Sequence, residues 1–347
     1  MLTISASKLK DYASAIFAAG GAAEDDAGIV GDALVDANLA GHDSHGVMRI
    51  PNYVGWMEQK LINVEAELKV VADAEAFAVV DCDWGFGQVM GREATDLAIA
   101  KAFNSGAASV AGRNCCHLGR LGDYPAMAAH EGMVAVMFIN THGGGKIVAP
   151  FGGIERRLSA NPIAIGIPRA QGPIVVDVST CSIAEGKVRN MRTAGQPVPA
   201  GCIIDAEGNP STDANDFYGP PPGALLPFGG HKGFALGLAA DILAGALSGA
   251  GCSRPGVDRI GNSFLITVID IAQMRDRGQF DEDVHNLVEH VKSSKLAPGV
   301  DEILVPREPE SRTQERRERD GIPIHEATWA ALAEVAGKYG VAVHALE

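Results

Sequence analysis

Apolar residues recur at helical or strand spacing along most of the chain. Spacing of three and four residues predicts helices over about 7–18, 23–39, 88–104, 124–132 and 327–339. Short runs rich in Val, Ile and Phe predict strands over 77–81, 107–112, 134–140, 164–167, 174–178 and 264–269. Glycine- and proline-rich segments separate these elements. The pattern predicts a mixed α and β protein without the regular βαβ alternation of a doubly wound sheet.

Two segments depart from ordinary amphipathic spacing. The stretch 234–250 is almost wholly apolar, but it contains Asp241, Ser248 and internal glycines and is too short for a membrane span, so we expect a buried helix. Charged residues dominate 307–320, which predicts a solvated turn or helix face.

Composition narrows the class of protein. A chain of 347 residues with 46% hydrophobic content can bury a large core in one to three domains. The net charge of -14, without clusters of Lys and Arg, excludes an ordinary nucleic-acid binder. No basic segment followed by an apolar run opens the chain, and the six cysteines show no CxxC spacing. We therefore expect a cytoplasmic protein that binds neither nucleic acid nor membrane.

The segment 41–51 (GHDSHGVMRIP) concentrates groups that do chemistry. Imidazoles of His42 and His45, with an ordinary pKa near 6.5, can exchange protons near neutral pH, and the Arg49 guanidinium can grip a carboxylate in a fixed orientation. A purely structural alternative is a helix end followed by a turn at Asp43 and Ser44. Zinc is not expected, because no second cluster of ligands accompanies the histidines. The segment favours a reaction on a small carboxylated substrate.

Phosphate-binding motifs give a mixed result. No GxGxxG follows an early strand, and Gly186-Lys187 is followed by Val188 where a P-loop needs Ser or Thr. The segment 226–233 (LPFGGHKG) leads into the apolar stretch, where helix-end amides with His231 and Lys232 would suit an anion. Tight packing of the glycines is the alternative.

Several separated segments carry a family resemblance: 38–46 (NLAGHDSHG), 85–89 (GFGQV), 117–122 (HLGRLG), 161–162 (NP), 199–205 (PAGCIID) and 230–233 (GHKG). Together they resemble the malate/L-lactate dehydrogenase family of NAD(P)-dependent oxidoreductases, and within it the hydroxycarboxylate dehydrogenase B subgroup. The resemblance implies an α+β fold, not a Rossmann fold. A helical part is built from 1–75 and 306–347, and 76–305 holds the cofactor on a mostly antiparallel sheet. It also implies a homodimer.

The resemblance also implies roles for single residues. His45 matches the family's proton donor, Ser44 and His117 line the same pocket, and Arg49 matches a position that holds the substrate carboxylate. The implied cofactor-binding residues are His45, Gly119, Arg120, Leu121, Val175, Val176, Asp177, Val178, Ser179, His231, Lys232, Asn262, Arg307, Glu308, Pro309 and Glu310.

Three departures from the family pattern border the expected pocket. Arg307 stands where the family usually has the glycine of Pro-Gly-Glu, Cys115-Cys116 replaces a polar pair, and Ser159-Ala160 replaces Gly-Thr. An arginine at 307 either pairs with the 2′-phosphate of NADP or points to solvent. Both NAD and NADP therefore stay open as cofactors, with NAD the first expectation.

The sequence thus predicts reversible hydride transfer between NAD(P) and a 2-hydroxy or 2-oxo acid. Reduction of a cyclic imine carboxylate or a diketo sugar acid, and oxidation of ureidoglycolate, are alternatives within the same family. A dinucleotide-binding protein without catalysis is an alternative from another class, against which the intact Ser44, His45 and His117 argue.

Overall fold

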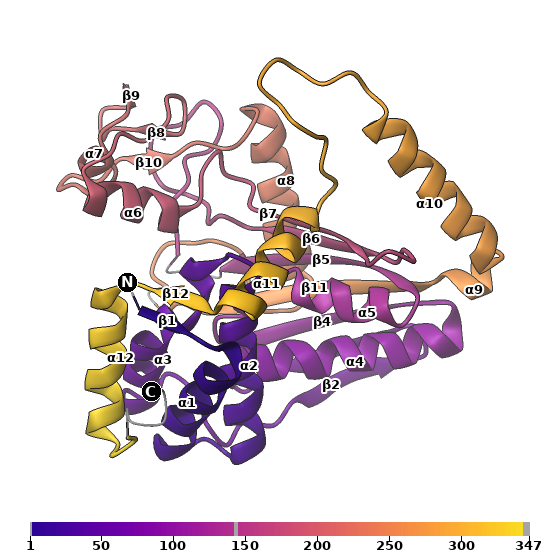
Figure 1. Ribbon diagram of the computed structural model, residues 1–347, viewed down its shortest axis with the longest axis horizontal. Helices are drawn as coiled ribbons and strands as arrows, with labels where there is room; N and C mark the ends of the chain where they lie inside the picture. The colour runs from indigo at the N-terminus through magenta and orange to yellow at the C-terminus, as the bar shows by residue number, and fades with distance from the viewer. Residues whose placement is uncertain (1, 142–144, 258, 343–347) are drawn as a thin grey trace.

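A seven-stranded mixed sheet forms the centre of the molecule (Figure 1). The computed structural model describes residues 2–141, 145–257 and 259–342. Across the sheet the strands run in the order β2 (Lys69–Ala74), β3 (Phe77–Asp81), β4 (Ala107–Cys115), β11 (Asn262–Asp270), β5 (Met133–Thr141), β6 (Ile163–Ile167) and β7 (Ile174–Val178). Within the described chain, neighbours are antiparallel except β3 and β4, which α4 (Gly87–Ser105) connects. The predicted mixed, mostly antiparallel sheet is confirmed.

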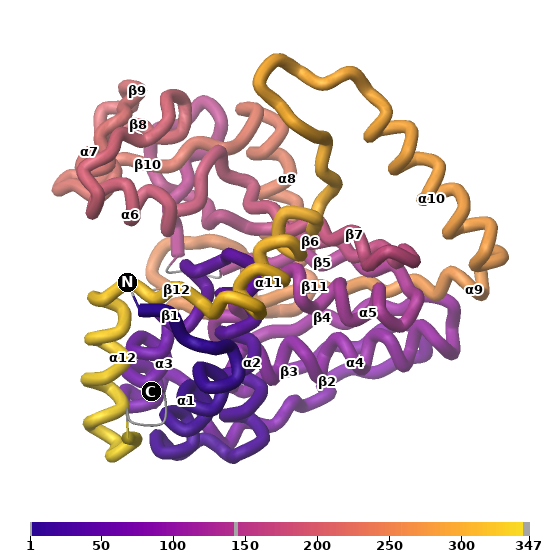
Figure 2. The backbone as a smooth tube through the Cα atoms, in the orientation of Figure 1, coloured from indigo at the N-terminus to yellow at the C-terminus, as the bar shows by residue number. Residues whose placement is uncertain are grey.

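The two ends of the chain meet in a helical region (Figures 1 and 2). Strand β1 (Leu2–Ile4) pairs antiparallel with β12 (Ile322–Ile324). Around this pair lie α1 (Ala6–Ala19), α2 (Glu24–Leu39), α3 (Ile50–Glu58) and α12 (Glu326–Lys338). Leu9, Ile16 and Phe17 of α1 are fully buried, as their spacing predicts. One continuous apolar core joins these helices to the sheet.

Different helices cover the two faces of the sheet. Alternate residues of β5, such as Met137 and Ile139, lie in the core beneath α4 and α5 (Asp123–His130). On the opposite face, Asn140 packs against α8 (His231–Asp241) and its π-helical continuation Ile242–Ala246. Along most of β5, buried residues alternate with partly buried ones, and the two sets face different helical layers.

The prediction that 234–250 forms a buried helix is wrong for one side of that helix. Its small residues face the sheet, and the carbonyl of Gly237 accepts a hydrogen bond of 2.9 Å from Asn161 Nδ2. Leu236, Leu238, Ile242 and Leu247 are 42–59% exposed. Hydropathy alone could not separate the two sides, because the residues that permit close packing are glycine and alanine.

A second, smaller core lies in the part of the molecule at the upper left of Figure 1, above the helical region of the chain ends. Its residues include Val188, Ile203, Phe217 and Leu225. They come from α6 (Glu185–Ala194), β8 (Ile203–Ile204), α7 (Ala214–Tyr218) and β10 (Ala224–Leu225), and β9 (Pro210–Ser211) completes a three-stranded sheet with β8 and β10. This region has apolar packing of its own and borders the site described below.

The C-terminal third contains further helices. After α9 (Ile271–Met274) and α10 (Arg277–Lys292), a long connection returns to α11 (Glu308–Asp320), which lies beside α2. The charged segment 307–320 was predicted to form a solvated turn or a helix face, and residues 308–320 form a helix. In the described part of the chain, no helix has the length and hydropathy required to cross a bilayer.

Candidate active site

The turn after α2 is fixed by a network around Asn38. Two 3₁₀ turns, Asp43–His45 and Val47–Arg49, connect α2 to α3. Asn38 Oδ1 accepts a bond of 2.8 Å from the Val47 amide, and Asn38 Nδ2 donates to Asp43 Oδ1 at 2.6 Å. A Cβ on Gly46 would lie 2.2 Å from Asn38 Oδ1, so this position accepts only glycine. The network fixes the residues on either side of Gly46.

His45 stacks on His117, with ring centroids 5.7 Å apart and an interplanar angle of 17°. Ser44 Oγ lies 3.0 Å from His45 Nδ1. Burial lowers the pKa of His45 to about 4, with smaller effects of the nearby cations Arg49 and Arg120. At neutral pH His45 is therefore a neutral imidazole that can accept a proton.

A buried relay orients His117. Gln88 Nε2 donates to Tyr53 Oη at 2.9 Å, and Tyr53 Oη lies 2.6 Å from His117 Nδ1. Burial raises the pKa of Tyr53 and lowers that of His117, so both groups are neutral at pH 7. The tyrosine hydroxyl accepts from Gln88 and still has its own proton, which it can donate to His117 Nδ1. With Nδ1 as the acceptor, the single N–H of the neutral His117 ring lies on Nε2, as a donor toward a ligand.

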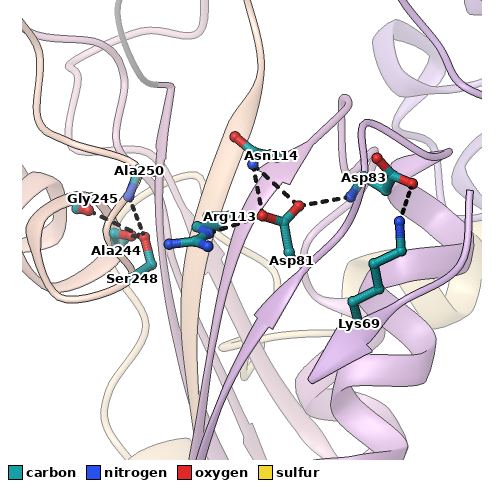
Figure 3. Close-up of polar contacts among 9 residues, drawn as sticks. All are labelled: Lys69, Asp81, Asp83, Arg113, Asn114, Ala244, Gly245, Ser248 and Ala250. Carbon is teal, nitrogen blue, oxygen red and sulfur yellow. Dashed lines mark hydrogen bonds and ion pairs between the residues drawn. The ribbon is translucent and has the colours of Figure 1, made fainter. Parts of the chain in front are cut away.

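The loop that carries His117 leaves the sheet at a polar cluster (Figure 3). Asp81 accepts bonds from Arg113 Nε at 3.0 Å and from Asn114 Nδ2 at 2.9 and 3.1 Å. Asn114 has a left-handed backbone, with φ of 52°. Asn262 Oδ1 accepts the Leu118 amide at 3.0 Å on the far side of His117. The loop is thereby fixed on both sides of the histidine.

Arg49 contributes a buried positive charge to the same region. Its Nε donates to the Ser44 carbonyl at 2.7 Å, and burial lowers its pKa. Gly186 at the start of α6 packs on Ser44, since a Cβ there would lie 3.1 Å from Ser44 Cβ. The small second core therefore borders the catalytic turn directly.

Two adjoining cavities lie beside these residues. The first, of about 400 Å³, is lined by His45, Gln88, Gly119, Arg120 and Asp123, among others. Arg120 Nη2 lies 3.0 Å from Asp123 Oδ1, and burial raises the pKa of that carboxyl group to about 6. The second cavity, of about 330 Å³, is lined by Arg120, residues 175–178 of β7 and residues 304–307 before α11. Arg120 borders both cavities and connects them.

The structure brings together most, but not all, of the predicted site residues. Ser44, His45, Arg49 and His117 form one cluster. Of the implied cofactor-binding residues, those that line a cavity are His45, Gly119, Arg120, Val175, Val176, Asp177, Val178, Arg307, Pro309 and Glu310. The described lining of both cavities does not include Leu121, Ser179, His231, Lys232, Asn262 or Glu308.

Three of those six residues have other surroundings. The carboxylate of Glu308 binds Lys292 Nζ at 2.6 Å and accepts the Val305 amide at 3.0 Å. The ring of His231 packs edge-on against Phe151, with centroids 6.0 Å apart. Asn262 acts through the loop, by the bond to Leu118 already described.

Tyr53, Gln88 and Arg317 belong to the site, yet sequence reasoning gave them no role. Tyr53 follows Arg49 by four residues, which places both on one side of a helix, but α3 itself was not predicted. Arg317 of α11 binds Asp43 Oδ1 at 2.6 Å and also donates to the Asn38 carbonyl. No sequence pattern connects residues so far apart in the chain.

The other departures from the family pattern are packed inside the protein. Cys115 and Cys116 are buried, and Cys116 Sγ donates to the Trp84 carbonyl at 3.1 Å. Burial raises the pKa of Cys116 to about 12, so this thiol is not a nucleophile. Within the described residues, no group of three or more His, Cys, Asp or Glu side chains is placed to hold a metal ion.

Comparison with known proteins agrees with this geometry. The malate/L-lactate dehydrogenase family model matches residues 4–333. The chain is 38% identical to an L-lactate dehydrogenase of Cupriavidus necator, with 99% of each chain covered. It is 36% identical to hydroxycarboxylate dehydrogenase B of Escherichia coli, with 99% of this chain and 96% of the other covered. The solved sulfolactate dehydrogenase of Methanocaldococcus jannaschii matches with a TM-score of 0.90 at 34% identity, and 99% of both chains is covered. The chain therefore belongs to the malate/L-lactate dehydrogenase family and is, with it, a dehydrogenase of hydroxy acids.

Proposed function

We propose that this protein interconverts a 2-hydroxy acid and its 2-oxo acid, with His45 as the group that exchanges the proton. The observation that carries the proposal is the stacked pair of His45 and His117. Each ring has its Nδ1 engaged, by Ser44 Oγ at 3.0 Å and by Tyr53 Oη at 2.6 Å. The Nε2 atoms remain for the reacting oxygen, one as a proton acceptor and one as a donor.

Arg49 is the proposed partner of the substrate carboxylate. Its Nε is held by the Ser44 carbonyl at 2.7 Å, which fixes the plane of the guanidinium next to His45. A fixed guanidinium binds a carboxylate through two parallel bonds and so orients the carbon that carries the oxygen.

The adjoining cavities fit a nicotinamide dinucleotide. The first lies beside His45, the second has apolar walls from Val175, Val178 and Leu304, and Arg120 stands between them. The cavity beside His45 suits the nicotinamide, Arg120 suits the pyrophosphate, and the cavity with apolar walls suits the adenosine. When bound, the nicotinamide supplies or accepts the hydride.

The charge state of His45 explains how one residue serves both directions. In the free protein burial and nearby cations keep it neutral, which suits removal of the hydroxyl proton during oxidation. A substrate carboxylate on Arg49 offsets one of these cations and favours the protonated ring, as reduction requires. The bound 2-oxo acid therefore raises the pKa of His45 by removing the contribution of Arg49, while the larger effect of burial remains.

A homodimer and a reducing, cytoplasmic environment complete the proposal. Leu236, Leu238, Ile242 and Leu247 form an exposed apolar row over α8 and its continuation, and a second copy would cover such a surface. All six cysteines are free. Light scattering at micromolar concentration should give the mass of two chains, and a monomer would contradict this part of the proposal.

The catalytic proposal is tested by absorbance at 340 nm. NADH and NADPH are each combined with oxaloacetate, pyruvate, phenylpyruvate, 2-oxoglutarate, a diketo sugar acid and a cyclic imine carboxylate. We expect oxidation of the nucleotide with at least one simple 2-oxo acid. Turnover of only the sugar acid or the imine would contradict the proposed substrate class.

A further inference from the structure

Arg307 occupies a conformation that an arginine adopts only at a cost. It precedes the first residue of α11 with φ of 81° and ψ of -18°, in the left-handed region. For a residue with a Cβ this conformation costs on the order of 1–2 kcal/mol, and glycine avoids most of that cost. Strained residues persist where their side chain has a function, so the guanidinium of Arg307 requires an explanation.

The Arg307 side chain enters the second cavity without a protein partner for one of its donors. Arg307 lines that cavity, and its Nη1 is buried with no hydrogen-bond partner among the described residues. A buried, unpaired guanidinium nitrogen is unfavourable unless a ligand binds it.

The carboxylates around this cavity each have another partner, and none of them accepts a hydrogen bond from Arg307 Nη1. Glu310 lies 3.5 Å from His42 Nε2. Asp177 Oδ2 accepts the Gly122 amide at 2.8 Å. Asp123, which borders the neighbouring cavity, lies 3.0 Å from Arg120. Arg307 therefore has a donor left over for an anion that enters with the ligand.

We propose that Arg307 binds the 2′-phosphate on the adenosine ribose of NADP and thereby selects NADP over NAD. This inference rests on the proposed dinucleotide site and reverses the sequence-based preference for NAD. The position of Arg307 distinguishes the 2′-phosphate from the pyrophosphate. The pyrophosphate joins the two halves of a dinucleotide, so a residue that binds it should border both cavities, as Arg120 does. Arg307 lines the cavity with the apolar walls, proposed for adenosine, and not the cavity beside His45. A phosphate monoester and a guanidinium form two charge-assisted bonds, which NAD cannot provide.

The test compares binding of NADP+, NAD+ and adenosine 2′,5′-bisphosphate by isothermal calorimetry. The variant is Arg307→Gly, which relieves the backbone strain and so does not endanger folding. Glycine at position 312 would weaken α11, so the matched control is Arg312→Ala, which removes an exposed arginine of α11 that pairs with Glu302 in the preceding connection. We expect Arg307→Gly to weaken NADP+ and the bisphosphate by about 10- to 100-fold and NAD+ by less than about threefold.

Two results would overturn the inference while leaving the dinucleotide site intact. Equal weakening of NAD+ and NADP+ would assign Arg307 to the pyrophosphate. Unchanged affinity for all three ligands would leave Arg307 without a role in binding. Failure of the wild-type protein to bind either dinucleotide would instead refute the proposed function itself.

Discussion

Replacing Tyr53 by phenylalanine removes one oxygen atom from the centre of the site. Tyr53 is 1% exposed, and its Oη joins Gln88 at 2.9 Å to His117 at 2.6 Å. The variant leaves a buried N–H of Gln88 and the Nδ1 of His117 unpaired, at about 1–3 kcal/mol each. Removing the hydroxyl also removes the cost of burying that polar group, which offsets part of this loss. We therefore expect the free energy of unfolding to fall by about 2–4 kcal/mol in total.

The same change should alter catalysis through His117. Without the tyrosine proton on Nδ1, the ring loses about 1–1.5 kcal/mol of preference for the tautomer with Nε2–H, so kcat should fall by up to about tenfold. Urea denaturation at fixed protein concentration measures the first effect. Steady-state kinetics and ¹⁵N shifts of the imidazole measure the second.

Tyr12→Phe is the matched control for this experiment. Tyr12 is also buried, at 3% exposure, but its hydroxyl has no hydrogen-bond partner among the described residues. Its removal should leave stability and kcat unchanged or slightly raise stability. If both variants unfold at the wild-type urea midpoint and His117 keeps its tautomer in Tyr53→Phe, the relay from Gln88 through Tyr53 neither stabilises the fold nor orients His117.

Further predictions concern the charges around the catalytic turn. Arg49→Leu should raise KM for the acid by about 10- to 100-fold, and an unchanged KM would exclude its role as carboxylate partner. Arg317→Leu breaks the ion pair with Asp43 and should lower kcat by about tenfold, and thermal denaturation checks that the variant still folds. The control Arg319→Leu removes an exposed ion pair with Asp320 and should have the kcat of the wild type. The pKa of His45 is about 4 in the folded protein and near 6.5 in the unfolded chain, so the unfolded chain binds the proton more readily. The free energy of unfolding should therefore be highest above pH 6.5 and should decline as the pH falls toward 4. For His45 alone this amounts to about 2 kcal/mol between pH 7 and pH 5, and an equal pH dependence in His45→Gln would contradict it.

The sequence predicted helices and strands well where buried residues recur at the regular spacing of a helix or a strand. The buried residues of α1 agree with the predicted spacing because one side of this helix packs against the continuous core, and the predicted strand 134–140 lies within β5. Helix α3 was not predicted, since Pro51 and Gly55 interrupt its pattern. Helix α10 was not predicted either, although Phe280, Val284, Leu287, Val288 and Val291 recur at helical spacing, and of these only Val288 is buried.

The cluster of Ser44, His45 and Arg49 was predicted from neighbouring residues of the sequence, but the contacts that support it were not. His45, Ser44 and Arg49 are neighbours in the sequence, whereas Arg317 meets Asp43 only because β1 and β12 bring the two ends of the chain together. The relay to His117 likewise depends on how α3, α4 and the loop after β4 pack. Tertiary contacts of this kind leave no periodic signal in a single sequence.

A paired measurement on His45→Gln shows whether His45 exchanges the proton. NADPH oxidation with the best 2-oxo acid is followed at 340 nm, and NADPH binding is measured on the same samples. If His45 is the proton donor, kcat falls by at least about 10³-fold while cofactor affinity stays within about threefold of the wild type. A variant that binds NADPH and reduces the acid at near wild-type rate would show that another group supplies the proton.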